Sequence, residues 1–184
     1  DFRRRALPKH PAAIAILTSV PSSALADMLR TAKERWPLTR LLIIPIPVQG
    51  DVAKKIQSVL RSLAREHQQL GIESIVLARG GGSREDLMVF DDEALCRDLA
   101  DFPIPVVTGL GHEDDQTVAD LVADYRAATP TAAMVALLPS RESAKSELMQ
   151  RSQRLADHCT WLIRKERERL ADRGKALEFQ QPLK

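Results

Sequence analysis

Apolar positions in the first three quarters of the chain form short continuous runs, separated by stretches of helical spacing. Four runs predict strands, at 12–20, 40–48, 74–80 and 105–112, and the first is typical of a strand buried on both faces. Between them, stretches such as "LADMLRTA" and "IQSVLRSL" repeat apolar residues every three or four positions, which predicts helices. This alternation predicts a Rossmann-like three-layer α/β fold, in which helices cover both faces of a parallel sheet. The order of the strands stays open.

Local residues refine this pattern. Pro45 and Pro47 favour a sheet edge or a strand end for the second run. Ser22 or Ser23 is suited to cap the first helix, and further helices are expected at 91–100 and at about 115–124.

The last quarter of the chain differs in composition, because it has many charged residues and few glycines. Leu148, Leu155 and Leu162 recur every seven residues, which predicts one long helix over 140–184, following an α/β domain at 1–139. The second apolar position of each heptad is polar. Two alternatives therefore stand, a coiled-coil arm and a lone amphipathic helix packed on the body.

Composition narrows the class of protein only modestly. The 184 residues are 44% hydrophobic and 4% aromatic, which suits one compact domain with an appendage and few base-stacking surfaces. The formal net charge is +2, with the body slightly acidic and the tail basic. The total charge therefore neither requires nor excludes binding to nucleic acid. Cys96 and Cys159 match no metal spacing and no apolar run reaches transmembrane length, so we expect a cytoplasmic protein with reduced thiols and no membrane partner.

The first candidate for chemistry is the stretch "LARGGGSREDL", where the third strand ends. Gly80, Gly81 and Gly82 allow main-chain N–H groups, including that of Ser83, to converge on an anion, and Arg79 adds a planar donor fork that matches phosphate. The spacing fits neither a Walker loop nor a dinucleotide fingerprint. A flexible turn is the alternative.

The second candidate is "GHEDDQTVADLVAD", where the fourth strand ends. His112 is suited to general acid–base work near neutral pH. Five carboxylates follow it with no Lys or Arg between them: Glu113, Asp114, Asp115, Asp120 and Asp124. They could bind Mg²⁺ or Mn²⁺, or simply favour a helix N-terminus, and at helical spacing Asp120 and Asp124 would share a face.

The junction after the first strand supplies the third candidate region. Asp27 lies in the helix that follows it, where a solvated helix residue is the simpler interpretation. Since ligands of parallel α/β sheets bind beyond the carboxyl ends of the strands, the three junctions together predict one site.

These segments, with "LPKHPAAIAILTS", "FDDEAL" and "DYRAATPTAA", resemble the exodeoxyribonuclease VII large-subunit family from about Leu7 to Met134. The resemblance implies a cytoplasmic DNA-repair nuclease that degrades single-stranded DNA to short oligonucleotides from either end. It implies no need for ATP, no strict need for a metal, although Mg²⁺ is possible, and small helical subunits bound along the arm. The family's N-terminal OB-fold has no counterpart, so we expect the catalytic domain with part of the arm.

The family's functional positions fall on Asp27, Arg79, His112 and Asp115. In the mechanism that we expect, Arg79 and the N–H groups of residues 80–83 bind the scissile phosphate, and His112 transfers a proton. Asp115 orients His112 or raises its basicity, and Asp27 positions water or a second donor. The chain departs from the family's usual "GHETD" at residue 114 and reads "TSVPSSA" at its first junction.

Three other functions are weighed against this one. They are a metal-dependent phosphohydrolase using the acidic cluster, a non-catalytic Rossmann-type module that binds an anion or nucleotide, and a scaffold whose arm only assembles partners.

Overall fold

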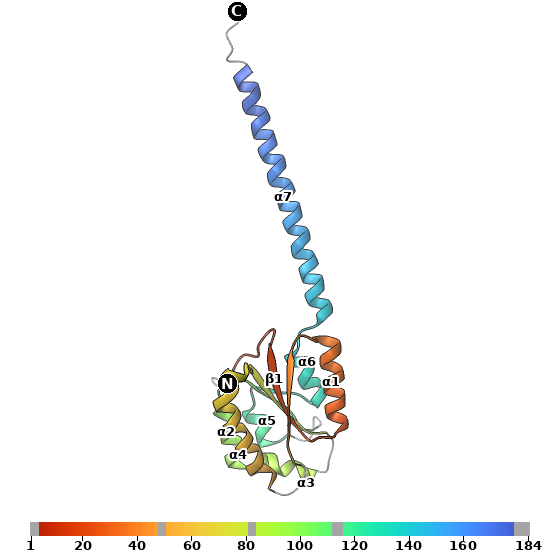
Figure 1. Ribbon diagram of the computed structural model, residues 1–184, viewed down its shortest axis with the longest axis vertical. Coiled ribbons are helices and arrows are strands. Elements are labelled where there is room, and N and C mark those ends of the chain that lie inside the picture. The colour runs from red at the N-terminus through yellow and green to blue at the C-terminus, as the bar shows by residue number, and fades with distance from the viewer. Residues whose placement is uncertain (1–3, 48–50, 81–83, 112–115, 179–184) are drawn as a thin grey trace, which may run out of the picture. The chain divides into compact units, whose positions relative to one another are not determined.

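A computed structural model of the chain describes residues 4–47, 51–80, 84–111 and 116–178. A five-stranded parallel sheet forms the middle layer of residues 1–141 (Figure 1). Its strand order is β2-β1-β3-β4-β5. The strands are β1 Ala13–Thr18, β2 Arg40–Pro45, β3 Ser74–Ala78, β4 Val106–Gly109 and β5 Tyr125–Arg126. The four predicted strands are confirmed. The fifth was not predicted, because two residues are too few to show a periodic pattern.

Helices cover both faces of the sheet, which confirms the three-layer α/β fold (Figure 1). One face carries α1 Ser23–Arg35 and α6 Pro130–Leu137. The other carries α2 Val52–Leu70, the 3₁₀ helix η1 Met88–Asp91, α4 Glu93–Ala100 and α5 Val118–Val122. The short helix α3 Arg84–Leu87 lies between the third strand and η1.

Alternation along the central strands divides the core in two. In β1, Ile14 and Ile16 pack with Met28 of α1, whereas Ala15 and Leu17 pack into the layer of α2 and α4. All six residues of β1 are buried, which explains why this strand reads as a continuous apolar run. The strand with prolines, β2, lies at the sheet edge and ends at Pro45, as predicted.

Side-chain caps define where several helices begin. The Ser22 hydroxyl accepts a hydrogen bond from the Leu25 N–H at 3.1 Å, so Ser22 rather than Ser23 caps α1. Thr129 caps α6 in the same way, through the Ala132 N–H at 3.0 Å. These caps hold the starts of α1 and α6 at the carboxyl edge of the sheet, where β1 and β5 end.

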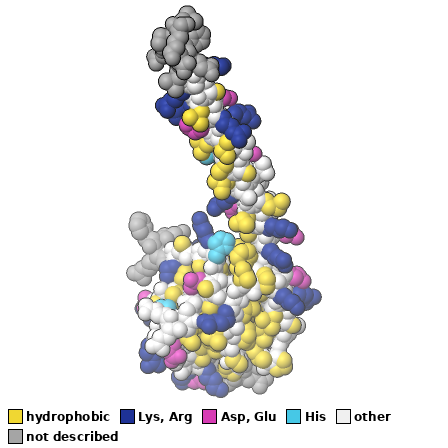
Figure 2. Space-filling view, turned by 45° about the horizontal axis from the view of Figure 1, so that its top comes forward, with side chains coloured by type: hydrophobic (Ala, Val, Ile, Leu, Met, Phe, Trp, Pro, Cys, Tyr) yellow, Lys and Arg dark blue, Asp and Glu magenta, His cyan; other side chains and the backbone are white. Residues whose placement is uncertain are grey.

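The chain divides into two compact units, residues 1–141 and 142–184. The predicted long helix is present as α7, Arg141–Glu178. Its heptad residues Leu148, Leu155 and Leu162 are 72%, 65% and 42% exposed, and Figure 2 shows apolar side chains between Lys and Arg along this helix. In the described part of the chain, no helix is both long and apolar enough to span a membrane.

Candidate functional site

The strand order locates the point at which the sheet reverses direction. The chain passes from β1 outward to β2 and then crosses back to β3, on the other side of β1. Sheets of this order bind ligands beyond the carboxyl ends of the strands on either side of the reversal. In this chain those strands are β1, which leads to the start of α1, and β3, which leads to Arg79.

Gly80 lies directly against α1. A Cβ atom at residue 80 would be 3.1 Å from the Cβ of Ala24, in the first turn of that helix. The start of the glycine loop and the N-terminus of α1 are therefore neighbours, at the edge where the sheet reverses. The positive end of the α1 dipole favours an anion near this contact.

The end of β4 joins the same edge. The Arg79 N–H donates to the Gly109 carbonyl at 3.1 Å, which extends the β3–β4 pairing to the loop. A Cβ at residue 109 would be 3.0 Å from the Thr129 carbonyl oxygen and from the Pro130 Cα, so the start of α6 packs on this strand end. The three strand ends predicted to form one site therefore lie at one edge of the sheet.

Five of the predicted site residues lie outside the described residues: Gly81, Gly82, Ser83, His112 and Asp115. Their roles stay predictions. Three others are described, namely Asp27, Arg79 and Gly80.

The Arg79 side chain is largely buried and paired. It is 15% exposed, and its Nη2 lies 3.0 Å from Oδ2 of Asp86 at the end of α3. Its Nη1 also donates to the main-chain carbonyl of Asp86. Asp86 was not singled out from the sequence. The only signal available was a carboxylate seven residues after an arginine that needs a counter-ion once it is buried.

Asp27 occupies the second turn of α1. Because residues three apart on a helix are neighbours, it lies next to Ala24, the residue that Gly80 contacts. Its carboxylate forms an ion pair with Arg30 and is 48% exposed. This pairing agrees with a solvated helix residue, and a role for Asp27 in catalysis stays a prediction.

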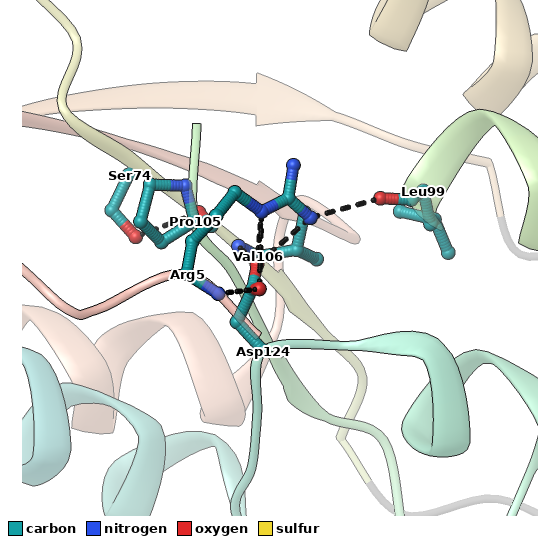
Figure 3. Close-up of polar contacts among 6 residues, drawn as sticks. All are labelled: Arg5, Ser74, Leu99, Pro105, Val106 and Asp124. Atoms are coloured by element: carbon teal, nitrogen blue, oxygen red, sulfur yellow. Dashed lines mark hydrogen bonds and ion pairs between the residues drawn. The ribbon is translucent and has the colours of Figure 1, made fainter. Parts of the chain in front are cut away.

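The prediction that Asp120 and Asp124 share a helix face is wrong, because α5 ends at Val122. The Asp124 carboxylate instead accepts hydrogen bonds from the Arg5 main-chain N–H at 2.6 Å and from the Val106 N–H at 2.7 Å (Figure 3). It also pairs with the Arg5 guanidinium. Asp124 therefore holds the lead-in segment against the start of β4. This is the amino end of the strands, whereas the candidate site lies at their carboxyl ends.

Asp120 caps the N-terminus of α5. Its Oδ2 accepts from the Thr117 N–H at 3.0 Å and from the Thr117 hydroxyl at 2.9 Å, in a capping box. The guanidinium of Arg126 lies 3.8 Å from the same oxygen. Two of the five carboxylates proposed as metal ligands thus have structural partners. Among residues 4–47, 51–80, 84–111 and 116–178, no group of three His, Cys, Asp or Glu is placed to hold a metal.

Cys96 is unsuited to act as a nucleophile. Its side chain is buried in α4, and its Sγ donates to the Phe90 carbonyl at 3.3 Å. Burial, with the nearby charges of Asp91 and Asp92, raises the pKa of the Cys96 thiol to about 11. The thiol therefore stays protonated at neutral pH.

Comparison with known proteins identifies the family of the chain. A family model described as "Exonuclease VII, large subunit" matches residues 1–184. The exodeoxyribonuclease 7 large subunit of Synechococcus sp. (strain CC9902) is 66% identical over 182 residues, which are 99% of this chain and 47% of that protein. That of Legionella pneumophila (strain Lens) is 47% identical over 138 residues, 75% of this chain and 31% of that protein.

The chain spans about half the length of the Synechococcus relatives that it matches over nearly its whole length. The family model nevertheless covers every residue, including the glycine loop and the segment that carries His112. The chain belongs to the exonuclease VII large-subunit family.

Proposed function

We propose that this chain is the catalytic part of a nuclease that hydrolyses phosphodiester bonds of single-stranded DNA to short oligonucleotides, from either end and without ATP. Family membership supports the reaction class. The observation that carries the proposal is the position of Arg79, which follows β3 at the reversal of the sheet and precedes the Gly80 contact with α1.

Three features of this edge favour a phosphate group. The Arg79 guanidinium supplies a fixed positive charge and a planar set of donors. The N-terminus of α1 adds the positive end of a 13-residue helix. The glycines after Arg79 have no side chains to keep a phosphate from the main chain.

In the proposed reaction a water molecule attacks phosphorus, and the bond from phosphorus to the leaving nucleotide oxygen breaks. Arg79 stabilises the negative charge that develops on the phosphate oxygens. His112 moves a proton to the leaving oxygen or from the water, Asp115 orients His112, and Asp27 positions water. The last three roles rest on the family resemblance.

We propose that the reaction needs no cofactor and tolerates the removal of divalent metal, with Mg²⁺ as an optional ion. The structural roles of Asp120 and Asp124 support this proposal, because they leave a smaller acidic cluster to act as ligands.

We also propose that α7 binds the small subunit of the enzyme. The exposed leucines of its heptad support this, since an apolar stripe on a helix is a surface that another helix can cover. A cytoplasmic location is proposed as well, on the basis of the two free cysteines.

The test uses the full-length large subunit assembled with its small subunit, with labelled single-stranded DNA as substrate. His112→Ala should slow cleavage about a hundredfold or more if His112 is the acid–base group. His67→Ala is the matched control and should leave cleavage unchanged. His67 lies in the last turn of α2, shortly before β3 begins, and so near the amino ends of the strands rather than their carboxyl ends. Near-normal cleavage by His112→Ala would contradict the assignment.

Two further outcomes would identify a rival function. Complete loss of cleavage in EDTA, restored by Mg²⁺, would indicate a metal-dependent phosphohydrolase. Tight binding of mononucleotides without any cleavage would indicate a binding module.

A further inference from the structure

We infer that Asp86 is a positioning residue, which holds the Arg79 guanidinium in the orientation that the phosphate requires. The inference rests on the proposed function, because it takes Arg79 to be the phosphate ligand. It assigns a task to α3, the short helix that follows the glycine loop.

The contact geometry fixes the guanidinium at both terminal nitrogens. Nη2 of Arg79 lies 3.0 Å from the Asp86 carboxylate, and Nη1 donates to the Asp86 main-chain carbonyl. Because the guanidinium is planar, two contacts on different nitrogens set the orientation of its plane as well as its position.

The other end of the Arg79 side chain is held too. Its main-chain N–H is bonded to the Gly109 carbonyl at 3.1 Å, and Gly80 beside it packs against Ala24. The sheet therefore fixes the Cα of Arg79 while α3 fixes its charged group. A long, flexible side chain held in this way loses its conformational freedom during folding rather than when substrate binds.

Asp86 can perform this task without blocking the phosphate. A guanidinium has five N–H donors, more than the two contacts with Asp86 use. Asp86 is 45% exposed and Arg79 is 15% exposed, so the carboxylate lies on the more accessible side of the pair. Since the carboxylate is half-exposed, its replacement leaves no cavity in the core.

The Asp86 carboxylate both orients Arg79 and adds a negative charge to the site, and the two properties affect kcat and KM differently. Without the carboxylate, the guanidinium loses its fixed orientation, and this orientation matters most in the transition state. The site also loses one negative charge, and this loss favours the binding of polyanionic DNA. Asp86→Asn should therefore lower kcat without raising KM for single-stranded DNA.

The experiment measures kcat and KM in the full-length enzyme with its small subunit, for Arg79→Ala, Asp86→Asn and the double variant. We expect Asp86→Asn to lower kcat about tenfold to a hundredfold and to leave KM equal or lower. If Asp86 acts through Arg79, the double variant should be no slower than Arg79→Ala alone. Asp86→Glu should recover part of the lost kcat, because it restores the charge.

Glu93→Gln provides the matched control, since Glu93 makes an exposed ion pair with Arg97 on α4. It should leave both constants unchanged. Thermal unfolding of each variant shows whether it remains folded. If Asp86→Asn is unstable, kcat and KM are measured below its unfolding temperature, and a normal kcat there would still overturn the inference.

Normal kcat for Asp86→Asn, with a large loss for Arg79→Ala, would overturn this inference and leave the proposed function standing. Losses that multiply in the double variant would also overturn it. Normal kcat for Arg79→Ala would remove Arg79 from the proposed mechanism, and this inference would fall with it.

Discussion

Arg5 and Asp124, which are 119 positions apart in the sequence, meet through two different parts of the arginine (Figure 3). The main-chain N–H of Arg5 donates to Oδ1 of Asp124 at 2.6 Å, and its Nε lies 2.9 Å from Oδ2. The Asp124 side chain is 2% exposed, so this carboxylate depends on the pairing. The contact joins the segment before β1 to the residue before β5, and Asp124 also accepts from the Val106 N–H at the start of β4.

Arg5→Ala should lower the free energy of unfolding by about 3 kcal/mol, because it leaves a buried carboxylate without its cation. Urea denaturation of this chain measures the change. Arg97→Ala, which breaks the exposed pair with Glu93, should cost under about 1 kcal/mol. Equal effects from the two variants would show that the Arg5–Asp124 pair contributes no more than a surface ion pair.

Ser22→Ala should destabilise the α/β domain by about 1 kcal/mol, because the Leu25 N–H loses its acceptor. Ser23→Ala is the neighbouring control and should have a much smaller effect, since Ser23 is already the first residue of the helix. Thermal or urea unfolding of both variants measures the difference. A larger loss for Ser23→Ala would contradict the assignment of the cap.

Gly80→Ala should slow cleavage of single-stranded DNA by the assembled enzyme. The new methyl group would meet the Ala24 side chain at 3.1 Å, which requires a shift of a few tenths of an ångström in the loop or in α1. Ala24→Gly in the same chain removes the obstructing methyl group and should restore part of the activity. Its own cost in helix stability is about 1 kcal/mol.

The control for this pair is Ala24→Gly alone, measured in the same cleavage assay and by unfolding. If the double variant is as slow as Gly80→Ala, then contact with Ala24 is not the reason that residue 80 must be small.

The Cys96 thiol should make the chain less stable as pH rises from 9 to 11. Its pKa is raised from 9.0 to about 11, so over this range the unfolded chain has lost the thiol proton while the folded chain keeps it. The free energy of unfolding therefore falls as pH rises through this window, and the contribution is fully present below pH 9. Urea denaturation at several pH values measures the slope.

Cys96→Ala should show a shallower fall over the same range, because it lacks the titrating group. Cys159, exposed on α7, is present in both proteins and cancels from the comparison. Identical slopes would rule out Cys96 as the cause.

Local pattern was sufficient for most of the elements. The runs that became β1 to β4, the helix capped at Ser22 and the long helix α7 are all set by residues close together in the chain. Burial of continuous apolar runs and helical spacing are local properties, so they can be read without knowing the topology. The same reasoning identified the glycine loop and placed three strand ends at one edge.

Tertiary structure alone decided the order of the strands and the partners of the charged residues. The sequence has no local signal for the crossing that brings β3 beside β1, which puts Arg79 where the sheet reverses. Asp120 and Asp124 looked like ligands because their neighbours in the sequence are acidic, yet their partners include Arg126 and Arg5. Ion pairs between distant residues depend on which segments the tertiary fold brings together. Periodicity, by contrast, indicates only which positions of one segment are buried.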